Sequence, residues 1–322
     1  MTLHSMDTAP RKLFHETPFL APETRWAASK LPNSERQWMV NNLLHRYEMF
    51  DAGWKLLADA HRPVNGGDIG KGSFGALYGD SRGGKTAICE AYMAKYPPSI
   101  DEDGEVYPMV YIAATAGMTP STLTDEIYYQ TGSRAQAAKV PQHIRNRNAL
   151  DRLIVHRTEL VIIDDAQYLL FDRRKDEVPK FNSFIRSLIE AKSFAVVLVG
   201  EPKIRKWVFS LPEMSGRNYF EEFVVQFDGS EDGRERFQLL MGGIDDLLPF
   251  AETSNLGEPD MADEMYAYSD GYLGRVMVVI RRACWTAINE GHRYIRPETL
   301  RDACMRSPWK ENQRTFFNFG AA

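Results

Sequence analysis

Four residues between positions 79 and 86 have the types and spacing of a phosphate-binding loop. Gly79, Gly84, Lys85 and Thr86 fit the pattern G-x-x-x-x-G-K-[ST]. The glycines allow backbone N–H groups to close around phosphate oxygens, Lys85 is suited to the β- and γ-phosphates, and the Thr86 hydroxyl is suited to Mg²⁺. The predicted nucleotide-binding residues of this loop are Gly79, Asp80, Ser81, Arg82, Gly83, Gly84, Lys85 and Thr86.

The context of this loop decides between a phosphate site and an ordinary Gly-rich turn before a surface helix. An apolar run, GALY at 75–78, precedes it, and a helical pattern, TAICEAYMAKY, follows it. A strand before and a helix after is the arrangement that the motif requires. The sequence therefore predicts a nucleotide site, with ATP and Mg²⁺ as the cofactors.

A second candidate pair, Asp164 and Asp165, ends the apolar run ELVIIDD at 159–165. Carboxylates at the end of a buried strand are costly unless they have a partner there. Beside a phosphate loop, Asp164 is expected to share the Mg²⁺ with Thr86, and Asp165 is expected to polarise the attacking water. The alternative is a strand that runs into an acidic, solvated turn.

Two arginines are candidates for stabilising charge on the transferred phosphoryl group. Arg217 lies in LPEMSGRNYF, from where it could reach the nucleotide of a neighbouring subunit, and Arg275 lies in SDGYLGRVM. The alternative for either is a solvated surface arginine. Glu201 ends the fourth predicted strand, where a polar residue could face the γ-phosphate, but a carboxylate suits a triphosphate poorly.

Five short apolar runs alternate with helical patterns between residues 75 and 227. Continuous Val/Ile/Leu runs indicate strands buried on both faces, and their alternation with helices indicates a parallel sheet. One of the helices, in TPSTLTDEIYYQTG, is expected to be capped at Thr119 or Ser121. The five predicted strands are 75–78, 106–112, 159–165, 195–202 and 221–227. The fold class is therefore α/β, with a five-stranded parallel sheet followed by a small all-α lid.

This pattern divides the chain into four parts. Residues 1–35, rich in Pro and polar residues, are expected to form an extended N-terminal arm. Residues 36–229 form the α/β nucleotide-binding domain and 230–305 the helical lid. Residues 306–322 form a tail whose phenylalanines either anchor on a partner or pack back onto the lid.

The composition narrows the class of protein. The chain has 322 residues, 43% hydrophobic and 26% charged, which is typical of a globular protein. No apolar run approaches the ~18 residues of a membrane span, so no membrane contact is expected. The three cysteines form no C-x-x-C pair and suit a reducing, cytoplasmic location.

A net charge of −5 neither indicates nor excludes binding to nucleic acid, because the placement of basic groups decides it. The stretch 139–157 carries Lys139, Arg145 and Arg147 among five basic residues, against one acid. These three could neutralise DNA phosphates without reading sequence. The alternative is an ordinary solvated helix face.

Four stretches together resemble AAA+ ATPases, and more narrowly the TniB/TnsC group of transposon target-selection ATPases related to MuB. They are ALYGDSRGGKT, LVIIDDAQYL, VLVGEP and SDGYLGRVMVVIRRACWTAINEGHRYIRPETL, and the resemblance extends over residues 35–305. The resemblance implies an AAA+ P-loop domain in which Asp164 is the Walker B aspartate and Asp165 the catalytic acid. It further implies that Arg217 is a finger acting in trans and Arg275 a second sensor.

The function that this resemblance implies is ATP-dependent regulation of DNA transposition. Such a protein would form a homo-oligomeric ring or helical filament on double-stranded DNA, mark the target, and recruit a DDE-type transposase, in some members with a TniQ-type adaptor. The family more often has Glu where Asp165 stands, which predicts slow ATP hydrolysis. The alternatives are a helicase-loader or initiator-like AAA+ ATPase, and a nucleotide-gated scaffold with little hydrolysis.

Overall fold

The computed structural model describes residues 13–133, 140–171, 174, 176–211, 219–311 and 313–319. Two compact units account for them. One unit contains Glu48–Val224, and the other combines Leu13–Tyr47 with the chain from Val225 onward. The first is called the α/β unit below and the second the helical unit.

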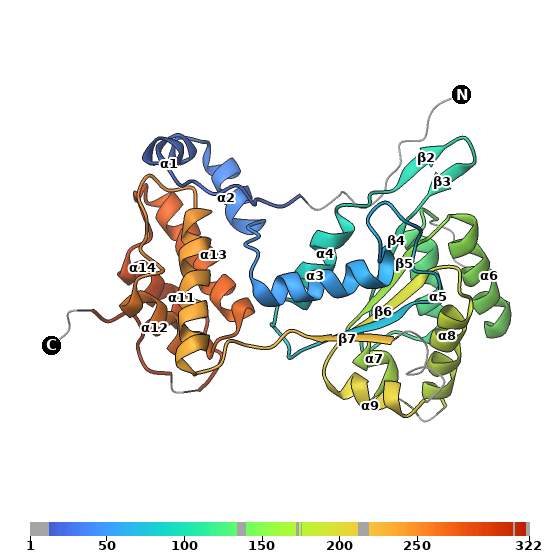
Figure 1. Ribbon diagram of the computed structural model, residues 1–322. Helices are drawn as coiled ribbons and strands as arrows, with labels where there is room; N and C mark the ends of the chain where they lie inside the picture. Colours follow the sequence, from blue (N-terminus) through green and yellow to red (C-terminus); the bar gives the residue numbers. More distant parts are fainter. Residues whose placement is uncertain are drawn as a thin grey trace. The chain divides into compact units, whose positions relative to one another are not determined.

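The α/β unit is built on a five-stranded sheet in the order β4-β5-β6-β1-β7, in which all neighbouring strands run parallel (Figure 1). This confirms the predicted α/β fold with a five-stranded parallel sheet. Each predicted strand is present, with ends shifted by a few residues. The strands are β1 (Phe74–Tyr78), β4 (Met109–Ala113), β5 (Leu160–Asp164), β6 (Ala195–Gly200) and β7 (Tyr219–Phe223).

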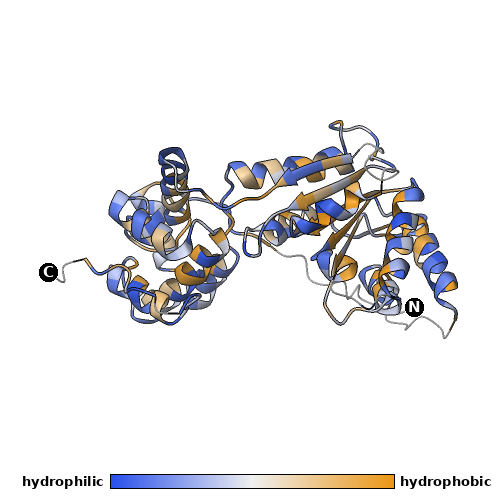
Figure 2. Cartoon of the chain, turned by 90° about the horizontal axis from the view of Figure 1, so that it is seen from below, coloured by the Kyte–Doolittle hydropathy of each residue, from blue (hydrophilic) through white to orange (hydrophobic). Residues whose placement is uncertain are grey.

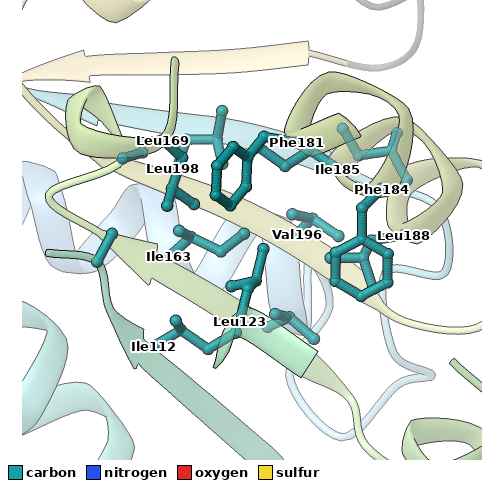
Figure 3. Close-up of a cluster of buried hydrophobic side chains, with 14 of the residues drawn as sticks. Ile112, Leu123, Ile163, Leu169, Phe181, Phe184, Ile185, Leu188, Val196 and Leu198 are labelled. Atoms are coloured by element: carbon teal, nitrogen blue, oxygen red, sulfur yellow. The ribbon is translucent and has the colours of Figure 1, made fainter. Parts of the chain in front are cut away.

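The central strands are buried along their whole length because helices cover both faces of the sheet. Ile163 of β5 and Leu198 of β6 pack with Phe181 of helix α8 (Val178–Glu190) on one face (Figure 3). On the other face, Leu77 of β1 lies against Gly53 of helix α3 (Glu48–His61). Figure 2 shows the same arrangement of a largely hydrophobic sheet between helices that are hydrophilic on one side.

One helix of this unit, α3, precedes β1, and the others described lie between the strands in the chain, as predicted. They are α3 (Glu48–His61), α4 (Lys85–Met93), α5 (Pro120–Gln130), α6 (Gln142–Val155), α7 (Gln167–Leu170), α8 (Val178–Glu190) and α9 (Lys203–Phe209). The Thr119 side chain accepts a hydrogen bond from the backbone N of Thr122, which confirms Thr119 as the cap of α5.

The predicted second strand at 106–112 is two elements in the structure. Val106 ends β3 (Gly104–Val106), which pairs with β2 (Ser99–Asp101) in an antiparallel hairpin, and β4 begins at Met109. Pro108 separates them because it has no N–H group to donate to a sheet ladder. The apolar run was therefore a poor guide to where one strand ends and the next begins.

The helical unit contains the predicted C-terminal helices α11 (Glu231–Asp246), α12 (Pro259–Ser269), α13 (Leu273–Asn289) and α14 (Pro297–Met305). Ser230 caps α11 by accepting a hydrogen bond from the backbone N of Gly233. The aromatic tail packs onto this unit, because Phe316 and Phe317 are both buried.

Two further helices of this unit come from the N-terminal part of the chain, α1 (Pro22–Ser29) and α2 (Asn33–Asn41). The described part of the expected extended arm is thus partly helical, because Pro22 occupies the first turn of α1, where its missing N–H costs nothing. The buried Arg25 guanidinium bonds to the carbonyl of Asp245 and the carboxylate of Asp246. Within the described residues, no helix is both long and apolar enough to cross a membrane.

Candidate functional site

The loop at 79–86 joins the end of β1 to the start of α4, at the carboxyl edge of the sheet. Arg82 and Gly84 both have left-handed backbone conformations, with φ of 68° and 99°. Such turns direct backbone N–H groups into a concave anion site, and the N-terminus of α4 adds its dipole there. Gly79 must be a glycine, because a Cβ would lie 2.1 Å from the backbone oxygen of Val224.

Lys85 is held inside this loop, with 8% of its surface exposed. Its Nζ donates to the backbone oxygens of Gly79 and Asp80 at 2.7 and 2.8 Å. Burial lowers the pKa of the Lys85 ammonium, and the charges of nearby carboxylates, first Asp164 and then Asp165, oppose that shift. An ammonium buried among carboxylates and carbonyls is suited to exchange one of these partners for a phosphate oxygen.

Asp164, the last residue of β5, is the buried carboxylate of the site, with 3% of its surface exposed. Its Oδ2 accepts hydrogen bonds from the hydroxyls of Thr86 and Tyr111, each at 2.7 Å, and its Oδ1 accepts from the backbone N of Asp165 at 2.8 Å. Burial and the charge of Asp164 raise the pKa of the Tyr111 phenol, so Tyr111 is a donor here. The structure thus brings together Thr86 and Asp164, which the sequence analysis paired across 78 residues of chain.

The oxygen atoms at this point fit a Mg²⁺ ion. A hydroxyl and a carboxylate oxygen, 2.7 Å apart, are ligands of the kind that this hard cation prefers. The glycine loop beside them fits the phosphates that complete such a site in other proteins, since Mg²⁺ usually keeps only one or two protein carboxylates. The donor set is therefore consistent with a nucleotide and its metal ion.

Asp165 lies next to this pair and is exposed. Its backbone is left-handed, with φ of 52°, a conformation that Asp tolerates better than most residues. Its Oδ1 accepts a hydrogen bond from the Gln167 side chain at 2.9 Å, and Gln167 in turn accepts from the backbone N of Glu201 at 3.2 Å. The Glu201 carboxylate itself pairs with Lys203 at 3.1 Å.

Comparison with known proteins agrees with this geometry. Residues 69–208 match a family described as an AAA domain. No curated protein matches the chain. The matched segment contains the phosphate loop, the acidic end of β5 and the end of β6. Residues 69–208 form an AAA-type P-loop domain.

Solved structures with the same fold include three archaeal proteins. The ORC2 protein of Aeropyrum pernix, in ADPNP–ADP complexes, is 16% identical with a TM-score of 0.54, over 81% of this chain and 68% of that one. Cdc6p of Pyrobaculum aerophilum is 15% identical with a TM-score of 0.56, over 83% and 69%. The ORC1 protein of A. pernix, in complex with DNA, is 18% identical with a TM-score of 0.54, over 88% and 69%. At these identities the likeness shows the AAA P-loop fold with its C-terminal helical region.

The two candidate arginines lie outside the AAA domain match. Arg217 falls outside the described residues. Arg275, at the start of α13, makes its contacts within the helical unit. Its guanidinium lies 3.4 Å from the ring centroid of Trp309. It also donates to the backbone oxygen of Ser269 at 3.0 Å and lies 3.5 Å from the Asp270 carboxylate. Its side chain is 19% exposed. Arg275 also lies 4.2 Å from the Tyr272 ring centroid, so the helical unit contacts its guanidinium from several sides.

The candidate DNA-binding residues of the AAA domain differ in exposure. Lys139 lies outside the described residues. On α6, Arg147 has a side chain that is 82% exposed and lies 3.8 Å from the Asp151 carboxylate. Arg145 is only 12% exposed and pairs with Asp125 at 3.5 Å. Arg147 is therefore better placed than Arg145 to meet a phosphate from solvent.

Two polar residues of the site were missed by the sequence analysis. Tyr111 interrupts an apolar strand, and Gln167 follows the acidic pair by two residues. The only signal for Tyr111 was a phenol within a buried run, which more often contributes to a core. For Gln167 there was no signal, because its second partner, Glu201, comes from a different strand end.

Proposed function

We propose that this chain is a Mg²⁺-dependent ATPase of the AAA type that binds duplex DNA in the manner of an initiator or helicase loader and acts in the cytoplasm. The observation that carries the ATPase part is the contact between Thr86 and Asp164, at 2.7 Å, beside a buried Lys85. A surface turn has no reason to place a hydroxyl, a buried carboxylate and a buried ammonium together.

Each of these residues has a distinct task in the proposed reaction. The backbone N–H groups of residues 79–86 and the Lys85 ammonium bind the phosphates, and Thr86 and Asp164 hold the Mg²⁺. The metal ion, when bound, neutralises charge on the phosphate oxygens. Asp165 orients the attacking water and accepts its proton, and its short side chain favours slow turnover.

The DNA-binding part of the proposal is supported by the ORC1 neighbour, which is in complex with DNA, and by the exposed Arg147 on α6. Contacts of this type go to phosphates, so binding would be weakly dependent on sequence and strongly dependent on salt. We further propose that the chain assembles as a homo-oligomer in which Arg217 serves the nucleotide of the adjacent subunit, with Arg275 as a second sensor.

Regulation of transposition is the second candidate function. It is favoured by the four sequence stretches that resemble the TniB/TnsC group. Under this proposal the partners are a DDE-type transposase and a TniQ-type adaptor rather than a replicative helicase. The ATPase chemistry and the DNA contacts are the same for both candidates, so only the partner distinguishes them.

The first test is nucleotide binding and hydrolysis by the full chain, with and without Mg²⁺. We expect Lys85→Ala to abolish binding and Thr86→Val to weaken binding in the presence of Mg²⁺ by about tenfold or more, because it removes one metal ligand. Thr253→Val is the matched control, because its hydroxyl donates to Asn255 Oδ1 at 2.9 Å within the helical unit. Equal effects of Thr86→Val and Thr253→Val would contradict the Mg²⁺ assignment.

The second test is assembly on duplex DNA with ATP, with a slowly hydrolysed analogue and with ADP, at two salt concentrations, viewed by negative-stain microscopy. Salt-sensitive rings or filaments that need a triphosphate would support the proposal. Mixing these assemblies with a helicase or with a transposase then separates the two candidates. Nucleotide binding without any DNA assembly would contradict both and favour a nucleotide-gated scaffold.

A further inference from the structure

Gln167 joins the ends of two neighbouring strands through its side-chain amide. It is the first residue of α7 and is 4% exposed. Its Nε2 donates to Asp165 Oδ1 at 2.9 Å, beyond the end of β5, and its Oε1 accepts from the backbone N of Glu201 at 3.2 Å, beyond the end of β6. The two bonds fix which end of the amide carries nitrogen, because a carboxylate only accepts and a backbone N–H only donates.

The surroundings hold this amide in place. A Cβ on Gly200 would lie 2.1 Å from Gln167 Oε1 and 2.7 Å from Ile204 Cδ1, so only a glycine leaves room for the amide there. The backbone N of Ala166 donates to the backbone oxygen of Val199 at 3.0 Å, which ties the turn before α7 to β6. A buried amide with both ends bonded in a fitted space has one orientation.

Asp165 needs such support more than a buried residue does. It is exposed, so no close packing restricts its side-chain torsions, and its left-handed backbone departs from that of β5. A bond to Oδ1 fixes the carboxylate plane and leaves Oδ2 for another partner. Because the same amide bonds to Glu201, a shift of the β6–α9 junction would also turn the Asp165 carboxylate.

We propose that Gln167 is a positioning residue for ATP hydrolysis: it orients the Asp165 carboxylate toward the attacking water and couples that orientation to the end of β6. This inference rests on the proposed function, in which Asp165 accepts the proton of the water. Gln167 does not touch the nucleotide in this scheme. It acts on the turnover rate and not on nucleotide affinity.

The experiment compares kcat and KM for ATP in the full chain with those of Gln167→Met and Gln167→Glu. Methionine keeps the volume and removes both hydrogen bonds, whereas glutamate keeps the acceptor for Glu201 but replaces the donor with a charge that repels Asp165. We expect kcat to fall about tenfold or more in both, most in Gln167→Glu, because a small misplacement of a catalytic group is costly. KM and nucleotide affinity should stay within about twofold, which also shows that the variants fold.

A matched control is Gln130→Met in α5. Gln130 also donates its amide to a carboxylate, that of Glu126 at 2.8 Å, and both residues lie away from the site. Its kcat should equal that of the wild type. An equal loss in Gln130→Met and Gln167→Met would overturn the proposal, because it would report a general effect on the unit.

A double-mutant cycle with Asp165→Asn separates positioning from an independent role. Asn tolerates the left-handed backbone, so this variant should fold. Its kcat should fall about 100-fold, and adding Gln167→Met should cause no further loss. Wild-type kcat in Gln167→Met, a loss of affinity in place of kcat, or additive losses in the cycle would each overturn the positioning role alone. A wild-type chain that binds ATP without hydrolysing it would overturn the proposed ATPase function and this inference with it.

Discussion

The tightest constraint on the phosphate loop is the space at Gly79, and Gly79→Ala measures it. The added Cβ would lie 2.1 Å from the backbone oxygen of Val224 and 3.4 Å from its Cβ. Hydrogen bonds restrict the backbone at both Gly79 and Val224, so neither segment can move away without breaking one. Gly79 donates to the oxygen of Gly200 at 3.0 Å, and Val224 donates to the oxygen of Tyr78 at 2.7 Å. The loop is therefore fixed between β6 and the chain leaving β7.

The contacts of the added Cβ allow the loss of stability in Gly79→Ala to be approximated. A clash with backbone, rather than with the end of a flexible side chain, is relieved only by moving β7, which costs about 2 kcal/mol as overpacking. Loss of the Val224–Tyr78 hydrogen bond adds about 1 kcal/mol. A loss of about 3 kcal/mol corresponds to a fall in Tm of about 6–12 °C for a unit of this size.

The assay is thermal unfolding by circular dichroism, with nucleotide affinity measured in parallel. Gly83→Ala provides an intermediate case, because its Cβ would lie 3.3 Å from the oxygen of Asp80. Gly117→Ala is the control, since nothing lies within 4 Å of its Cβ, and its Tm should be unchanged. We expect the loss of stability to follow the order of these distances. If Gly79→Ala and Gly117→Ala melted at the same temperature, the reasoning about the fixed loop would be wrong.

Three further predictions concern DNA contacts, pH and the tail. Arg147→Ala should reduce the slope of log affinity for DNA against log salt by about 1, whereas Arg145→Ala should mainly lower the free energy of unfolding. Burial lowers the pKa of His15 and His45 below the ordinary value of 6.5, so protonation favours the unfolded state. The helical unit should therefore lose stability as the pH falls below 6.5, which urea unfolding at pH values on either side of 6.5 would detect. Trp309→Ala should lower the Tm, because it removes the ring on which Arg275 lies, and should tighten ATP binding, because Arg275 is then released. Unchanged ATP affinity would argue against Arg275 as a second sensor.

Local sequence patterns predicted the five-stranded parallel sheet and the position of the phosphate loop between β1 and α4. The central strands β1, β5 and β6 are mainly apolar because both faces of the sheet are covered there. The phosphate loop is a contiguous motif whose conformation depends on its own glycines. The pairing of Thr86 with Asp164 followed from topology, since parallel strands bring their carboxyl ends to one edge. None of these inferences needed knowledge of long-range side-chain contacts.

The features that the sequence did not predict depend on contacts between residues far apart in the chain. The expected extended arm contains α1, whose Arg25 is buried by a contact with residues 220 positions away. Proline content alone cannot reveal such a partner. Gln167 was missed for the same reason, because its role depends on the backbone of Glu201. Sequence patterns are insufficient where a distant partner decides the conformation or the role of a residue.

Arg275 shows how the structure changes the meaning of a sequence prediction. The proposed sensor role requires Arg275 to exchange its contact with the Trp309 ring, worth about 1–2 kcal/mol, and with the Ser269 carbonyl, worth about 1.5–3 kcal/mol to a charged donor. A ligand shifts such an equilibrium only by its differential affinity for the two states. Under the proposed sensor role, a phosphate contact to Arg275 must therefore exceed about 2.5–5 kcal/mol before these two contacts are exchanged. The proposed sensor role therefore predicts that a triphosphate competes with the Trp309 ring and the Ser269 carbonyl for Arg275. If this proposal is right, removing Trp309 lowers the ATP concentration at which the protein responds.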